Sequence, residues 1–186
     1  MKITNTLRVT NRHAWRDWLK EHYHTDKEVW LVYPRKQSGK PRIPYNDAVE
    51  EALCFGWIDS TVKTLDAEAT VQKFSHRKRH AAYSQTDKER LARLIKQHKV
   101  MTDVLETLGD LDAEAFEIPA DIGKALKANR RAWRNFQRYS GPYQRIRIAF
   151  IAGARNRPEE FKKRLNHFLR MTEHNKQFGF GIESYY

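Results

Sequence analysis

Three side chains that could do chemistry stand close together in the most apolar stretch of the chain, residues 45–63 (YNDAVEEALCFGWIDSTVK). Cys54 could act as a nucleophile, Asp59 as a base or hydrogen-bond acceptor, and Trp57 as a stacking surface. Lys63 follows and could hold a small anionic substrate near them. The alternative is a packed junction, in which Trp57 and Cys54 belong to the core and Asp59 accepts backbone N–H bonds. We favour the packed junction, and we keep Trp57, Asp59 and Lys63 as a candidate pocket.

No pattern in the sequence identifies a catalytic residue. The thiolate is the reactive form of cysteine, and Cys54 ends a predicted helix, where the helix dipole raises the pKa of a thiol. The sequence contains no Ser-His-Asp signature, no cluster of metal ligands and no glycine-rich cofactor loop. We therefore predict no catalytic residue, no metal and no cofactor, and we lean against enzymatic activity.

A basic cluster with interleaved aromatic residues follows the apolar stretch. It comprises Lys73, His76, Arg77, Lys78, Arg79 and His80, with Phe74 and Tyr83 among them. Cations beside aromatic rings suit phosphate contacts combined with base stacking. The equally weighted alternative is a solvated strand end with two packed rings. The anion-binding candidates, from this cluster and from the C-terminal arginines, are Lys73, Arg77, Lys78, Arg79, Arg134, Arg138 and Arg145.

The formal net charge of +12 is concentrated in two blocks. Residues 71–100 carry a net +7 and residues 127–186 a net +10, whereas residues 101–126 carry a net −6. In the second block, one face of a predicted helix is lined by Arg130, Arg131, Arg134 and Arg138. Such blocks are the electrostatic footprint of a polyanion-binding protein. Because no named DNA- or RNA-binding motif accompanies them, nucleic-acid binding would be independent of sequence and sensitive to salt.

Hydrophobic spacing predicts the elements that position these residues. Apolar residues of 45–55 recur at helical spacing, Asn46 is a suitable N-cap, and Gly56 ends the helix because glycine tolerates left-handed backbone. Strands are predicted over Glu28 to Arg35, Ile58 to Leu65 and Ala69 to His76. The last two are predicted to form a hairpin. The segment RIRIAFI at 145–151 alternates like a strand, but its helical surroundings favour a helix.

These elements predict an α+β protein. Residues 1–84 form an α+β part, in which two helices pack on a small sheet of about three strands. Residues 85–186 form a mainly helical part, and whether the two parts share one core is left open. The aromatic tail QFGFGIESYY is predicted to dock in a groove of the protein rather than to be mobile.

Composition favours a folded protein in a reducing compartment. A chain of 186 residues with 40% hydrophobic and 12% aromatic residues can bury a core. Its single cysteine excludes an internal disulfide. The N-terminus shows no apolar stretch typical of a signal peptide, and the longest apolar run, Ile148 to Ala154, is too short to span a bilayer. We therefore expect a cytoplasmic protein without a transmembrane segment.

Two parts of the chain resemble a known family. The motif ALCFGWIDS at 52–60, followed by Lys63 and preceded by EVWLVYPRKQSGK at 28–40, resembles the bacteriocin-protection, YdeI/OmpD-associated family. The segment PYQRIRIAFIAGARNRPEEFKKRLNHFLRMTEHNK at 142–176 is similar to the C-terminal part of that family. The resemblance implies a role in resistance to bacteriocins or cationic antimicrobial peptides and association with an outer-membrane porin. It implies no agreed catalytic residues.

Three functions follow from these observations. We favour a non-enzymatic cytoplasmic stress or antimicrobial-resistance protein that binds an anionic partner through its basic surfaces. The alternatives are a sequence-nonspecific nucleic-acid-binding protein and, less favoured, an enzyme acting on a small anion at the Trp57–Asp59 junction. The partner would be nucleic acid or another polyanion, or a protein. Because like charges repel, this basic chain is not expected to bind a cationic peptide by simple charge attraction.

Overall fold

The fold comes from a computed structural model that describes residues 3, 5–78, 82–109, 111–113 and 115–186. The chain forms two compact units. Unit 1 comprises residues 1–83 and 90–111, and unit 2 comprises residues 84–89 and 112–186. The predicted α+β class is confirmed, because the sheet lies in unit 1 and unit 2 is helical.

The sheet of unit 1 has four strands over the described residues, in the order β1-β2-β4-β3. They are β1 (Thr6–Leu7), β2 (Glu28–Pro34), β3 (Trp57–Thr64) and β4 (Ala69–His76). β1 pairs with β2 in parallel, and the other pairs are antiparallel. The strand that the sequence did not predict is β1, whose two residues are too few to show an alternating pattern.

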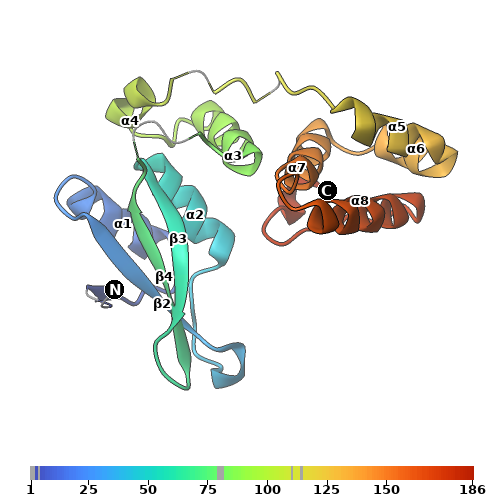
Figure 1. Ribbon diagram of the computed structural model, residues 1–186. Helices are drawn as coiled ribbons and strands as arrows, with labels where there is room; N and C mark the ends of the chain where they lie inside the picture. The colour runs from blue at the N-terminus through green and yellow to red at the C-terminus, as the bar shows by residue number, and fades with distance from the viewer. Residues whose placement is uncertain (1–2, 4, 79–81, 110, 114) are drawn as a thin grey trace. The chain divides into compact units, whose positions relative to one another are not determined.

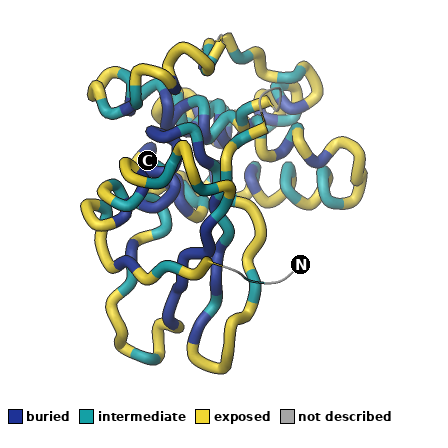
Figure 2. Tube along the Cα trace, turned by 90° about the vertical axis from the view of Figure 1, so that its left-hand side faces the viewer, coloured by how far each residue is buried: buried dark blue, intermediate teal, exposed yellow. Residues whose placement is uncertain are grey.

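Two helices of unit 1, α1 (Arg12–His22) and α2 (Tyr45–Cys54), pack against the sheet (Figure 1). β2 and β4 are largely buried, as the dark blue tube in Figure 2 shows, whereas most residues of β3 are half-buried or exposed. The main core cluster contains Trp15, Leu19, Val29, Leu31, Val49, Leu53, Trp57 and Phe74. A smaller cluster on the alternate strand positions contains Trp30, Val32, Ala69 and Val71. β2 is therefore buried on both faces, as its continuous run of apolar residues predicts.

The two ends of α2 test the predicted helix signals. The N-cap position is Pro44, so the prediction of Asn46 as the cap is wrong. The Asn46 side chain instead accepts a hydrogen bond from Arg90 Nη2 at 3.1 Å, a contact between residues far apart in the chain. At the other end, Gly56 has φ +70°, which confirms the predicted left-handed helix stop.

Replacing Gly56 by alanine is expected to lower the free energy of unfolding by about 1–2 kcal/mol, the cost of left-handed backbone for a residue with a Cβ. The space itself is sufficient, since the nearest atom to an added Cβ is a methyl of Val104 at 3.5 Å. Denaturant unfolding followed by circular dichroism measures the change. Gly123→Ala is the control, because Gly123 lies inside a helix and the same substitution is expected to stabilise the protein. The backbone argument would be wrong if Gly56→Ala and Gly123→Ala changed the free energy of unfolding by the same amount and in the same direction.

The short helix η1 (Lys36–Ser38) lies between β2 and α2. The helices that follow the sheet in the chain are α3 (Gln85–Lys96), α4 (Thr102–Thr107), α5 (Ala120–Ala128), α6 (Arg130–Phe136), α7 (Gly141–Ala152), α8 (Pro158–Glu173) and η2 (Glu183–Tyr185). The segment 145–151 lies within α7, so the predicted helix is confirmed. Over the described ranges, no helix combines the length and the apolar character needed to cross a membrane.

The C-terminal tail docks on unit 2, as predicted. Ile182 and Tyr185 are buried in the core of this unit. The Tyr143 hydroxyl accepts a hydrogen bond from the backbone N–H of Phe178 at 3.0 Å. The guanidinium of Arg147, which is only 6% exposed, lies 4.0 Å from the centroid of the Phe178 ring. Aromatic burial and a cation–π contact therefore hold the tail.

Candidate functional site

A cavity of about 260 Å³ opens in unit 1 at the junction between α2 and β3. Its walls come from four separate stretches: the loop after α1, the end of α2, the segment after β4, and α4. The aromatic wall is formed by Tyr23, Phe55 and Tyr83, and the ionisable lining by His24, His76, Arg77 and Asp103. Part of the predicted basic cluster therefore lines a concave site rather than a flat surface.

Arg77 is the group in this cavity that is best placed to bind an anion. Its backbone N–H donates to the carbonyl of Gly56 at 3.1 Å, which fixes the residue at the helix–strand junction. Its guanidinium carbon lies 3.5 Å from the centroid of the Tyr83 ring. Its Nε atom is buried and has no hydrogen-bond partner among the described residues. A buried donor without a partner is costly, so an anion in the cavity would satisfy it.

Asp103 and His24 form a second polar group at the cavity. Asp103 Oδ2 lies 3.4 Å from His24 Nε2 and accepts a hydrogen bond from the Tyr23 hydroxyl at 3.2 Å. Burial and the neighbouring Asp103 raise the pKa of Tyr23. The His24 and Asp103 side chains are 67% and 46% exposed, so water screens their interaction. Among the described residues, no group of three or more His, Cys, Asp or Glu side chains could hold a metal ion.

The rest of the predicted basic cluster divides into different environments. Lys73 lies on β4 and forms an ion pair with Glu28 on the neighbouring strand β2. The hydrogen bond that Glu28 accepts from Lys73 lowers the pKa of Glu28. The charge of Lys73 is therefore already compensated by a carboxylate. Lys78 is exposed, and Arg79 lies outside the described residues. Of this cluster, Arg77 and His76 line the cavity.

The structure does not bring Trp57, Asp59 and Lys63 together. Trp57 is fully buried, and its Nε1 donates to the Tyr23 carbonyl at 3.2 Å. Lys63 lies beyond an irregularity in β3 between Asp59 and Val62, and its Nζ is 5.4 Å from the Trp30 ring of the smaller core cluster. Because side chains alternate along a strand, this shift in register sends Lys63 to the other face from Trp57.

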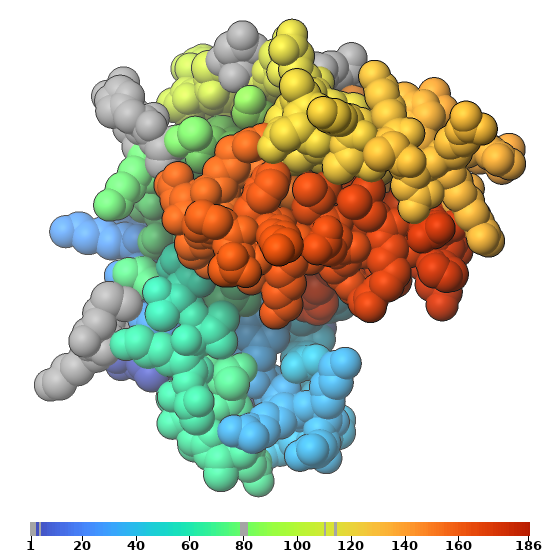
Figure 3. All heavy atoms as spheres, turned by 45° about the vertical axis from the view of Figure 1, so that its right-hand side comes forward, coloured from blue at the N-terminus to red at the C-terminus, as the bar shows by residue number. Residues whose placement is uncertain are grey.

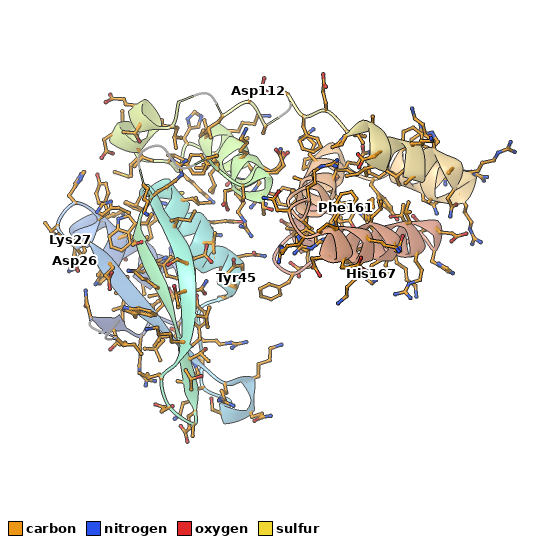
Figure 4. All side chains as sticks on the ribbon, in the orientation of Figure 1. Asp26, Lys27, Tyr45, Asp112, Phe161 and His167 are labelled. Atoms are coloured by element: carbon orange, nitrogen blue, oxygen red, sulfur yellow. The ribbon has the colours of Figure 1, made fainter. Side chains whose placement is uncertain are left out.

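Asp59 has a structural environment. It accepts hydrogen bonds from the hydroxyl of Tyr45, labelled in Figure 4, at 3.2 Å and from Gln72 Nε2 at 2.6 Å. These two partners are side chains of α2 and β4. A cavity does form beside this junction, and its lining includes Phe55 and Gly56.

The C-terminal candidates also differ from one another. Arg145 of α7 donates to both carboxylate oxygens of Glu89, through Nε at 2.6 Å and Nη2 at 2.9 Å. This bidentate pair makes Arg145 part of the structure of unit 2. Arg134 of α6 and Arg138 just after it are exposed, and no ion pair within the described part of the chain involves them.

Sequence reasoning missed the half of the cavity that comes from distant segments. His24 carried only a weak signal, as one of two histidines with His22 in a predicted loop, and Asp103 lay in a segment that reads as an acidic surface. Val104 and Thr107 carried none. Their part in the site depends on how α4 packs against the junction, which local patterns do not encode.

Cys54 is expected to resist a water-soluble thiol reagent at pH 8 for as long as the protein is folded. The residue is buried, and burial raises the pKa of its thiol to about 11. The unfolded thiol ionises near pH 8.5, so between these two values the unfolded state loses its proton first and stability falls as the pH rises. Labelling rates with and without denaturant measure the protection. Equal rates would contradict it.

Two family models match the chain. The model described as "Domain of unknown function (DUF8412)" matches residues 7–107, and the model described as "Bacteriocin-protection, YdeI or OmpD-Associated" matches residues 115–175. No curated protein and no solved structure matches the chain. The first match covers the sheet and the cavity, and the second covers α5 to α8, in agreement with the resemblance of the C-terminal segment. The chain therefore belongs to the DUF8412 family, and it continues into a region that is similar to the bacteriocin-protection, YdeI or OmpD-associated family.

Proposed function

We propose that this protein is a non-enzymatic anion-binding protein and that its ligand places a phosphate or carboxylate group against Arg77. The observation that carries this proposal is that Arg77, whose buried Nε has no hydrogen-bond partner among the described residues, lines a cavity of about 260 Å³. Arginine presents its donors in a planar fork that matches a carboxylate or phosphate.

The size and lining of the cavity support a small ligand or a single projecting group. Typical sites for drug-sized ligands measure about 300–1,000 Å³, so the volume of this cavity is too small for a whole cofactor. Tyr83 holds the guanidinium plane from one side, which reduces the entropy lost when an anion binds. The aromatic rings of Tyr23 and Phe55 supply an apolar surface beside the charge.

The proposal assigns no reaction to the cavity. The groups that could exchange a proton include His24, His76 and Asp103, and all three are exposed to water, whereas catalytic acids and bases are usually desolvated. Cys54, the strongest nucleophile of the sequence, is buried with a thiol pKa of about 11 and does not line the cavity. Binding rather than bond making is the better supported activity.

The biological role we propose is antimicrobial resistance in the cytoplasm, exerted indirectly. The name of the family that matches residues 115–175 links that region to bacteriocin protection. A chain with a net charge of +12 repels cationic peptides, so sequestering them directly is disfavoured. A basic protein can instead bind an anionic cell component through Arg77 and thereby contribute to protection.

The test is an NMR titration of the full chain with inorganic phosphate and, separately, with acetate. Binding in the cavity is expected to shift the backbone amide signals of Gly56, Arg77 and Val104 together, with one dissociation constant. Equal shifts at exposed lysines such as Lys20 and Lys162 would show non-specific binding. Such a result, or the absence of shifts at millimolar anion, would overturn the proposal.

A further inference from the structure

A second hollow lies in unit 2, between α5 and α6. Its volume is about 620 Å³, and its lining is mostly apolar: Ile118, Ala120, Gly123 and Ala128, with the indole of Trp133. Two cations border it, Lys124 and Lys127, and Lys127 Nζ lies 5.5 Å from the centroid of the Trp133 ring. Trp133 is partly exposed, and its ring stacks on Phe136 with the ring centroids 5.8 Å apart. The aromatic surface that stands beside the positive charge is therefore the part of the indole that Phe136 does not cover.

The helix that carries Trp133 also carries a row of arginines. Arg130, Arg131 and Arg134 are exposed on α6, and Arg138 follows the helix. Residues three and four apart lie on the same side of a helix, so Arg130 and Arg134 form one row, and Arg130 adjoins Trp133. The residues of α5 and α6 form a continuous yellow to gold part of the surface in Figure 3.

These arginines have no carboxylate partners in the described part of the chain. The stretch 122–158 contains no Asp or Glu. Of the carboxylates that flank this stretch, Asp121 pairs with Arg155 at 2.8 Å and Glu160 with Arg164 at 2.7 Å. Glu89 is likewise occupied by Arg145. The positive potential of this surface is therefore available to an external anion.

The chemistry of the surface favours a polyanion with accessible flat rings. Cations in a row suit successive phosphates, and an aromatic ring that lines a hollow suits one unstacked base. In a duplex the bases are stacked inside the helix and cannot enter a hollow. A membrane anchor, by contrast, needs apolar side chains that project, and Trp133 lines a concavity instead.

We infer that α5 and α6 form a binding site for single-stranded nucleic acid. One base stacks on Trp133 in the hollow, Lys124 and Lys127 contact its flanking phosphates, and the Arg130–Arg134 row contacts phosphates farther along the strand. Recognition is independent of base sequence, because every base offers a π-face. This site lies in unit 2 and does not depend on the Arg77 cavity of unit 1.

The test is fluorescence anisotropy of the full chain with a fluorescein-labelled oligothymidylate and with a duplex of equal length. Trp133→Ala is expected to weaken single-strand binding by at least about fivefold, whereas Trp133→Phe, which keeps a ring, retains most of the affinity. Arg130→Gln with Arg134→Gln is expected to reduce the slope of log affinity against log salt by about 1.4, since each contact contributes about 0.7.

The charge-matched control is Lys162→Gln with Lys163→Gln, which removes two exposed cations from α8. It is expected to change affinity less than the α6 pair. The inference is overturned if duplex binds as tightly as single strand, if the α8 pair costs as much as the α6 pair, or if Trp133→Ala abolishes binding to phosphatidylglycerol vesicles but spares the oligonucleotide. If Trp133→Ala does not fold, the salt slopes of the two double variants decide: the Arg130/Arg134 variant should have a clearly smaller slope than the Lys162/Lys163 variant, and equal slopes would overturn the inference.

Discussion

Replacing Arg77 by glutamine is expected to weaken the binding of inorganic phosphate by at least about tenfold, because a hydrogen bond to a charged group contributes about 1.5–3 kcal/mol. Glutamine keeps the polarity and much of the length of the side chain, but it loses the charge and the forked donors. Arg77→Lys should restore only part of the affinity, since a point charge cannot donate two parallel hydrogen bonds. Isothermal titration calorimetry of the full chain measures the phosphate affinity of the wild type and of the two variants.

Lys78 provides the matched control for this experiment. It is exposed, it follows Arg77 directly, and Lys78→Gln removes the same charge. If binding depends on the cavity, this variant should bind phosphate within about twofold of the wild type, as expected for a solvent-screened charge. Comparable losses in both variants would mean that general electrostatics, and not the Arg77 site, attract the anion. Thermal unfolding of each variant shows that the fold is kept.

Glu51→Gln is expected to lower the free energy of unfolding of unit 1 by about 3 kcal/mol, because it breaks a largely buried ion-pair network. Glu51 on α2 is 2% exposed and accepts hydrogen bonds from Arg12 Nε and Arg16 Nη1, both at 2.7 Å. Burial alone lowers the pKa of Arg12, and the hydrogen bonds to Glu51 and Glu50 more than compensate, so the pKa is raised. Without the carboxylate, two partly buried guanidinium groups lose their main partner.

Tryptophan fluorescence in a denaturant titration measures this loss, since Trp15, Trp18, Trp30 and Trp57 lie in unit 1 and Trp133 alone lies in unit 2. The control is Asp17→Asn, which breaks an exposed pair with Lys20 at 3.8 Å. That change is expected to cost less than about 0.5 kcal/mol. If Glu51→Gln unfolds at the same denaturant concentration as Asp17→Asn, the network does not stabilise the packing of α1 on α2.

Local patterns predicted most of the secondary structure because they depend on neighbours in the chain. β2 and β4 lie at the predicted residues to within one position, and the helix over 145–151 follows from its surroundings. Gly56 could be identified because a left-handed helix stop depends on one residue. The role of Asn46 could not be identified, because its side chain accepts a hydrogen bond from Arg90, a residue of α3 that is distant in the sequence.

Local patterns do not predict which basic side chain pairs with which carboxylate. In the sequence, Lys73, Arg77 and Arg145 are equivalent cations beside aromatic residues. The structure pairs Lys73 with Glu28 and Arg145 with Glu89, and it leaves the Nε of Arg77 without a partner among the described residues. Which cation is compensated depends on carboxylates brought near through space, and spacing along the chain does not report that distance.

The sequence alone therefore determined the elements, the fold class and the excess of positive charge, since each of these is a sum over local residues. Tertiary structure decided that Asp59 supports α2, that the register shift in β3 separates Lys63 from Trp57, and that Arg77 lines the same cavity as Asp103 and Val104. A cavity is the space left when segments distant in sequence pack incompletely, so its lining is set by the fold as a whole.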